Sequence, residues 1–76
     1  MKGAWSEWLD GCLTEVIKNN NLNGVVRVRN LILLVYPLFE KSKYSNHIKL
    51  SNYQIGRSMS RLEYKSFRTK ERFWVI

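Results

Sequence analysis

The sequence predicts an α+β fold with three helices, a short strand after the first helix, and a C-terminal β-hairpin. Three observations indicate it. Apolar residues recur at helical spacing near the N-terminus, a β-branched run follows Gly24, and residues 66–76 place aromatic side chains on both sides of a charged centre. Seventy-six residues suffice for one small core, so we expect a single domain over residues 1–76.

A first helix is predicted over about residues 4–19, because apolar residues recur there at i, i+3, i+4 and i+7. These residues are Trp5, Trp8, Leu9, Cys12, Leu13, Val16 and Ile17. The charged residues Glu7, Asp10, Glu15 and Lys18 occupy the other face. Asparagines 19–21 and Gly24 favour an end to the helix, since both residue types tolerate the left-handed conformation of a C-cap.

A strand over residues 25–28 and a second helix over about residues 30–42 are predicted next. The strand rests on three valines within four residues, and Asn30 is a candidate cap for the helix. The helix is apolar nearly all round, so we expect it to be the most buried element. Pro37 removes a backbone N–H, and a break or kink is therefore predicted near it.

The third helix is predicted over residues 51–65. Ser51 and Gln54 have the spacing of a capping box, in which each side chain satisfies a free backbone N–H of the first turn. Ile55, Met59 and Leu62 fall within one arc, so we expect them to face the core.

A hairpin is predicted over residues 66–76. We expect Phe67, Phe73 and Val75 to face the core across it. The short strand at residues 25–28 can pair with this hairpin to make a three-stranded sheet.

The net charge of +7 lies entirely in the C-terminal half. Residues 1–40 hold four basic and four acidic side chains, whereas residues 41–76 hold nine basic and only two acidic ones. A neutral scaffold with one basic end is typical of a protein that binds a polyanion, although a basic face kept for solubility is the alternative.

The order helix, strand, helix, helix, hairpin is that of a winged helix-turn-helix, in which the third helix enters the major groove of double-stranded DNA. Residues 51–65 would then be the recognition helix, and the basic hairpin would lie on the DNA backbone. The DNA-binding residues predicted on this basis are Lys49, Tyr53, Gln54, Arg57, Ser58, Ser60, Arg61, Tyr64, Lys65, Arg68, Lys70 and Arg72.

The stretch KLSNYQIGRSMSRLEYKSFRTKERFWVI resembles the end of the winged-helix domain that closes many phage, plasmid and poxvirus primase–helicases. The resemblance rests on Ile55, Gly56, Arg57, Leu62, Arg68, Arg72 and Trp74, and Val25–Phe39 looks like the strand and second helix of the same module. Glu63-Tyr64 departs from the pattern by replacing a Gly-Phe-like step. The resemblance implies a DNA-binding module of a phage or mobile element that acts in transcription regulation or DNA replication, either free-standing or cut from a larger protein.

Two other partners stay open as alternatives. Tyr44, Tyr53 and Tyr64 stand beside basic residues and could anchor an acidic host replication or transcription protein. Aromatic stacking on single-stranded nucleic acid is the other alternative. A homodimer is also compatible with DNA binding, because two copies double the readout.

Residue types that support catalysis or metal binding are scarce. Cys12 is the only cysteine and His47 the only histidine, so we expect no disulfide, no metal site, no cofactor and no enzymatic activity. No apolar signal-peptide core follows Lys2, and the apolar run from Leu31 to Phe39 is too short to span a membrane. We therefore expect a cytoplasmic protein.

Overall fold

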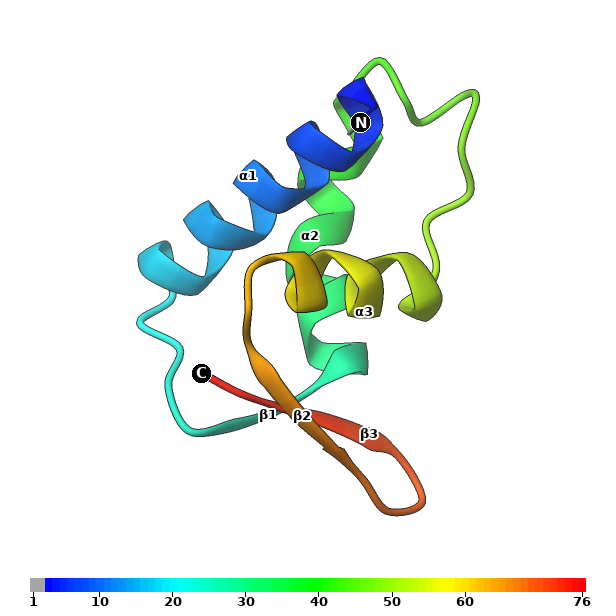
Figure 1. The fold of residues 1–76 in the computed structure, drawn as a ribbon. Coiled ribbons are helices and arrows are strands. Elements are labelled where there is room, and N and C mark those ends of the chain that lie inside the picture. The colour runs from blue at the N-terminus through cyan, green and yellow to red at the C-terminus, as the bar shows by residue number, and fades with distance from the viewer. Residues whose placement is uncertain (1–2) are drawn as a thin grey trace.

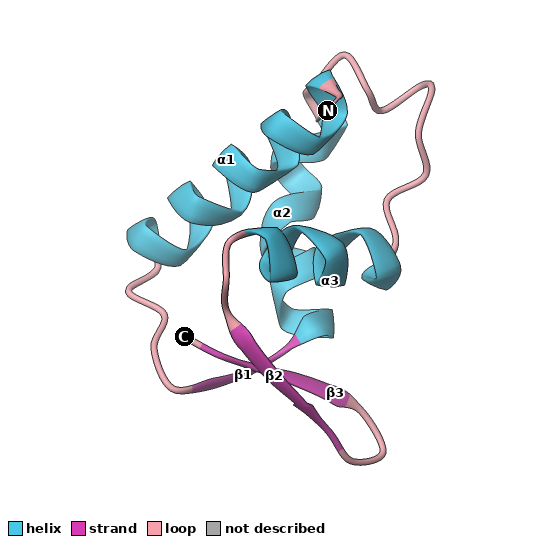
Figure 2. Cartoon of the chain, in the orientation of Figure 1, coloured by secondary structure: helices cyan, strands magenta, loops and turns pink. Residues whose placement is uncertain are grey.

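The computed structural model describes residues 3–76 as three helices and one three-stranded antiparallel sheet (Figures 1 and 2). The α+β prediction is confirmed at this level. The helices pack together at one end of the molecule, and the sheet lies at the other end. The elements in chain order are α1 (Ala4–Asn19), β1 (Val25–Arg27), α2 (Val28–Glu40), α3 (Asn52–Arg61), β2 (Lys65–Arg68) and β3 (Arg72–Val75).

The sheet has the order β1-β3-β2, so the predicted pairing of the early strand with the hairpin is confirmed. The prediction for which hairpin residues face the core is wrong. Trp74 is the buried one, whereas Phe67 and Val75 are exposed and Phe73 is half-buried. Successive side chains alternate between the two faces of a strand, so burying Trp74 turns Phe73 and Val75 outward.

Helix α1 has the predicted bounds and supplies much of the core. Leu9, Leu13, Val16 and Ile17 are buried. Asn21 adopts a positive φ of 52°, the N–H of Asn21 bonds to the Lys18 carbonyl, and the N–H of Leu22 bonds to the Ile17 carbonyl. This is the Schellman arrangement, which satisfies the free carbonyls at the end of a helix.

Helix α2 begins and ends two residues earlier than predicted. Pairing with β3 stops at Arg27, and Val28 starts the helix directly, so Val28 is not a strand residue and Asn30 is not the cap. The chain stays helical through Pro37, so the predicted break is wrong, and the kink stays a prediction. Pro37 lies in the last turns with its side chain exposed.

Helix α2 is also not the most buried element. It buries three residues, Leu31, Val35 and Phe39, whereas α1 buries five. Leu33 and Tyr36 remain exposed on its outer side, and Leu38 is exposed beside α1.

Helix α3 ends at Arg61, well short of the predicted residue 65. Glu63 takes a positive φ of 69°, and the Tyr64 N–H bonds to the Met59 carbonyl, which is a second Schellman arrangement. Lys65 therefore belongs to β2, and Tyr64 follows the helix. The inward placement of Ile55 and Met59 is confirmed, since both are fully buried, and Leu62 packs half-buried against the core.

Within residues 3–76, no helix combines the length and the apolar character needed to cross a lipid bilayer.

Trp74 joins the sheet to the helices, because its ring lies beside Gly56 of α3 and is 1% exposed. We predict that Trp74→Ala lowers the free energy of unfolding by about 3–5 kcal/mol. The indole N–H has no hydrogen-bond partner among the described residues, so Trp74→Phe should cost much less. Urea unfolding of both variants tests this, and equal losses would contradict it.

Candidate nucleic-acid interface

The first turn of α3 is fixed by the predicted capping box, which is confirmed. The backbone N–H of Ser51 donates to Oε1 of Gln54 at 2.9 Å, and the N–H of Gln54 donates to Oγ of Ser51 at 3.4 Å. The Gln54 side chain is half-buried and committed to this cap through its oxygen. Gln54 therefore positions the helix. Its side-chain oxygen is not free to accept a hydrogen bond from a base, as the predicted role in base reading would require.

The last turn of α3 is held by Asp10 of α1. Nε of Arg61 donates to both carboxylate oxygens, at 3.1 and 3.0 Å, and a terminal nitrogen donates to Oδ1 at 2.8 Å. The Ser58 hydroxyl donates to the same oxygen. Asp10 and Ser58 are buried, so Ser58, which was predicted to bind DNA, faces inward, and Asp10 does not share the exposed face of Glu7 and Glu15.

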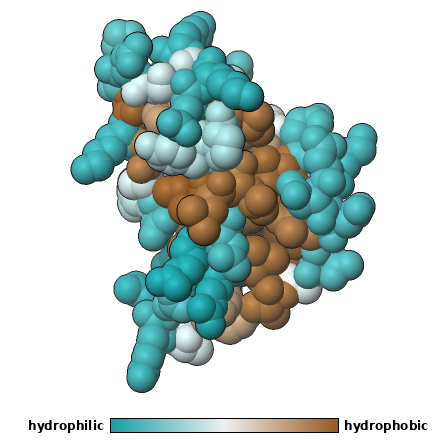
Figure 3. Space-filling view, turned by 180° about the vertical axis from the view of Figure 1, so that it is seen from behind, coloured by the Kyte–Doolittle hydropathy of each residue, from teal (hydrophilic) through white to brown (hydrophobic). Residues whose placement is uncertain are grey.

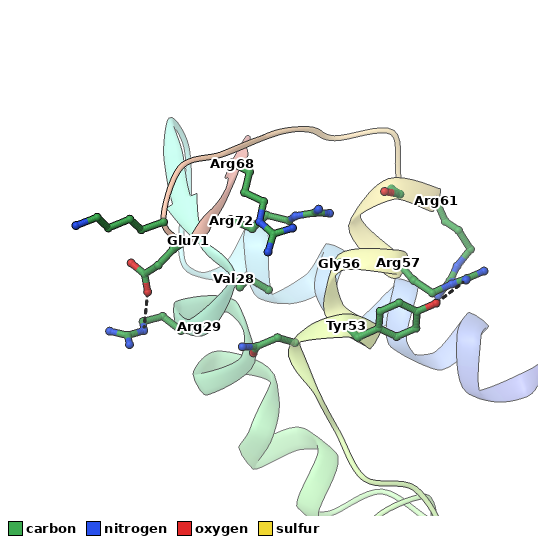
Figure 4. Close-up of a pocket in the computed structure, with 12 residues that line it drawn as sticks. Val28, Arg29, Tyr53, Gly56, Arg57, Arg61, Arg68, Glu71 and Arg72 are labelled. Carbon is green, nitrogen blue, oxygen red and sulfur yellow. Dashed lines mark hydrogen bonds and ion pairs between the residues drawn. The ribbon is translucent and has the colours of Figure 1, made fainter.

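An open groove of about 730 Å³ lies between α3 and the β2–β3 hairpin (Figure 4). Seen close up, Arg68 and Arg72 extend from the strands toward α3, and Tyr53 and Arg57 stand on the opposite side. Six basic residues and one acidic residue line it. The lining residues are Val28, Arg29, Asn52, Tyr53, Gly56, Arg57, Ser60, Arg61, Arg68, Lys70, Glu71 and Arg72.

Arg57 and Tyr53 form a pair on the α3 side of the groove. A terminal nitrogen of Arg57 donates to the Tyr53 hydroxyl at 3.0 Å, and the guanidinium lies 5.8 Å from the centre of the tyrosine ring. Tyr53 is 69% exposed, and Arg57 and Ser60 are exposed as well. The pairing limits the freedom of the arginine while its other donors face solvent, which favours a planar, multi-acceptor ligand.

Arg68 and Arg72 stand directly opposite each other across the hairpin. Like charges in this position destabilise a strand pair. An anion in the groove would reverse that repulsion, because both guanidinium groups could then donate to it.

Glu71, at the tip of the hairpin, contacts two arginines that the sequence did not place near the predicted DNA-binding surface. Glu71 lies 3.4 Å from Arg27 of β1 and 3.5 Å from Arg29 of α2, and Arg29 lines the groove. The distribution of charge along the chain did not indicate Arg27 and Arg29. They lie in the neutral N-terminal half, and only the pairing of β1 with β3 brings them to the hairpin. The predicted pairing of this strand with the hairpin was the available signal, and in the structure that pairing places Arg27 opposite Phe73.

The remaining predicted residues do not line the groove. Lys65 pairs with Val75 on the sheet face away from Trp74, and Lys49 lies exposed in the connector before α3. Tyr64 is half-buried and packs against the core.

We also searched the described part of the chain for metal ligands and for a reactive thiol. Residues 3–76 contain no cluster of His, Cys, Asp and Glu that could hold a metal ion. Burial raises the pKa of the Cys12 thiol, which keeps it protonated and a poor nucleophile.

No protein family, curated protein or solved structure gives a significant match to this chain.

Because Asp10 holds α3 in place, its loss should act on stability. We predict that Asp10→Ala lowers the free energy of unfolding by about 3 kcal/mol, since it leaves the partly buried Arg61 without its counter-charge. Glu15→Ala, an exposed site on the same helix, is the matched control and should change it by less than about 0.5 kcal/mol. Urea unfolding measures both, and similar small losses would contradict the anchoring role.

Proposed function

We propose that this protein is a sequence-specific double-stranded DNA-binding module of the winged helix-turn-helix class. Helix α3 would enter the major groove, and the β2–β3 hairpin would lie along the DNA backbone as the wing. The observation that carries the proposal is the groove between these two elements, where six basic side chains meet one carboxylate.

The dimensions and side chains of α3 suit this role. With its side chains an α-helix is about 10–12 Å across, and the major groove, about 12 Å wide, admits it. Arg57, Tyr53 and Ser60 are the exposed side chains that would reach base edges, with Arg57 the best suited to a bidentate contact with guanine. Arg68, Lys70, Arg72 and Arg29 would contact phosphates, which orient the domain without reading sequence.

In this proposal Arg61 has a different task from the one expected from sequence. Its guanidinium donates three hydrogen bonds to Asp10, so Arg61 mainly positions α3. Only its remaining N–H donors could contact DNA.

An acidic protein partner has less support. Of the three tyrosines considered as anchors, Tyr44 packs against Trp5 and Trp8, and Tyr64 is half-buried. Only Tyr53 is exposed, and it stands among arginines. The resemblance to the winged-helix ends of primase–helicases agrees with a DNA partner. We therefore propose that the protein acts in transcription regulation or DNA replication of a phage or mobile element.

A salt-titrated binding assay with random duplex tests the proposal. Fluorescence anisotropy of a labelled duplex should give a log–log slope of affinity against salt of about −3 to −4, as expected for about four phosphate contacts. An equal-length single strand should bind more weakly. A slope near zero, or a clear preference for the single strand, would contradict the proposal.

Arg57→Ala should weaken binding to a selected duplex target by about 1–3 kcal/mol and relax specificity at one base pair. Lys18→Ala removes the same charge from an exposed site outside the groove and should leave affinity and salt slope nearly unchanged. Equal effects of the two variants would mean that only net charge matters, and α3 would not be the reading element.

A further inference from the structure

Apart from Arg29, the outer side of α2 is a surface that the proposed DNA binding does not use. Leu33 is 68% exposed and Tyr36 47%, and Pro37, which follows Tyr36, is exposed as well. Helix α2 runs behind α1 and α3 in Figure 1, and the view from behind in Figure 3 shows apolar side chains gathered across the middle of that face. Single exposed apolar residues are ordinary on a protein surface, but a continuous group of them marks an interaction site.

The charges on this side of α2 specify the partner. Arg29, Leu33, Tyr36 and Glu40 follow the spacing i, i+4, i+7 and i+11, so they form one stripe along the helix. A basic residue begins the stripe, an acidic residue ends it, and apolar residues lie between. Glu40 has no ion pair among residues 3–76, and Arg29 is an exposed side chain with Nε 3.5 Å from Oε1 of Glu71.

This stripe is complementary to itself when reversed. If two copies of α2 cross antiparallel about a two-fold axis, Arg29 faces Glu40 of the other copy and Leu33 faces Tyr36 of the other copy. A contact of this kind uses the same surface twice and closes as a dimer. A parallel arrangement would instead place like charges opposite each other.

We propose that the exposed stripe of α2 is a homodimer interface, with a second copy of this chain packed antiparallel on it. The interface is separate from the groove between α3 and the hairpin, apart from Arg29 at its edge, and the proposal does not depend on DNA binding.

Sedimentation equilibrium of the full chain tests the proposal. The wild type should show a concentration-dependent mass rising from 9.1 kDa toward twice that value. Leu33→Glu should raise the dissociation constant at least about tenfold, as expected for loss of a central apolar contact. Val25→Glu, on the exposed outer face of the sheet, is the matched control and should dimerise like the wild type. Far-UV circular dichroism checks that both variants fold.

A charge exchange tests the antiparallel register. Glu40→Arg alone and Arg29→Glu alone should each weaken the dimer, and the double variant should restore it because both cross-axis pairs reform. A wild type that stays at 9.1 kDa up to millimolar concentration overturns the proposal. So does a dimer that is lost in Val25→Glu but kept in Leu33→Glu, or a double variant weaker than both single ones.

Discussion

The buried contact between Asp10 and the end of α3 is the interaction on which the groove depends. A carboxylate taken from water is costly unless hydrogen bonds and an opposite charge compensate it. Ser58 and Arg61 supply both from a single helix, so α1 holds α3 at a fixed position and rotation. Trp74 fixes the other boundary, since it packs between the sheet and Gly56. The groove is the space that these two contacts leave between α3 and the hairpin.

Features that depend on residues close together in the sequence were predicted correctly. The period of the apolar residues set the bounds of α1, and the Ser51–Gln54 spacing set the start of α3. The errors at Asp10 and in the hairpin concern partners distant in the sequence. Asp10 reads as a solvated residue until α3 packs against it, and the choice of the buried face of β3 depends on Trp74 meeting the helices. Glu63 occupies a left-handed conformation that glycine prefers, so the end of α3 carried no sequence signal.

The candidate site shows the same division. Arg57 and Tyr53 could be assigned from the helical period alone, because they point away from the core wherever the helix packs. Arg61 could not, since helical spacing places it beside Arg57 and only the fold gives it a carboxylate partner. Arg29 could not be assigned to the groove from the sequence either. It lies there because β1 pairs with β3, which brings the start of α2 close to Glu71 at the hairpin tip. The basic half of the chain thus divides into side chains that build the groove and side chains left free to bind.

The central proposal is that α3 enters the major groove of duplex DNA while the β2–β3 hairpin lies along the DNA backbone. Nuclear magnetic resonance titration of the ¹⁵N-labelled chain with a duplex tests it most directly. The backbone amide signals of residues 52–60 and 68–72 should shift on binding, while those of residues 4–9 at the far end of α1 stay in place. Shifts confined to α1 or to the outer side of α2, with none in the groove, would contradict the account.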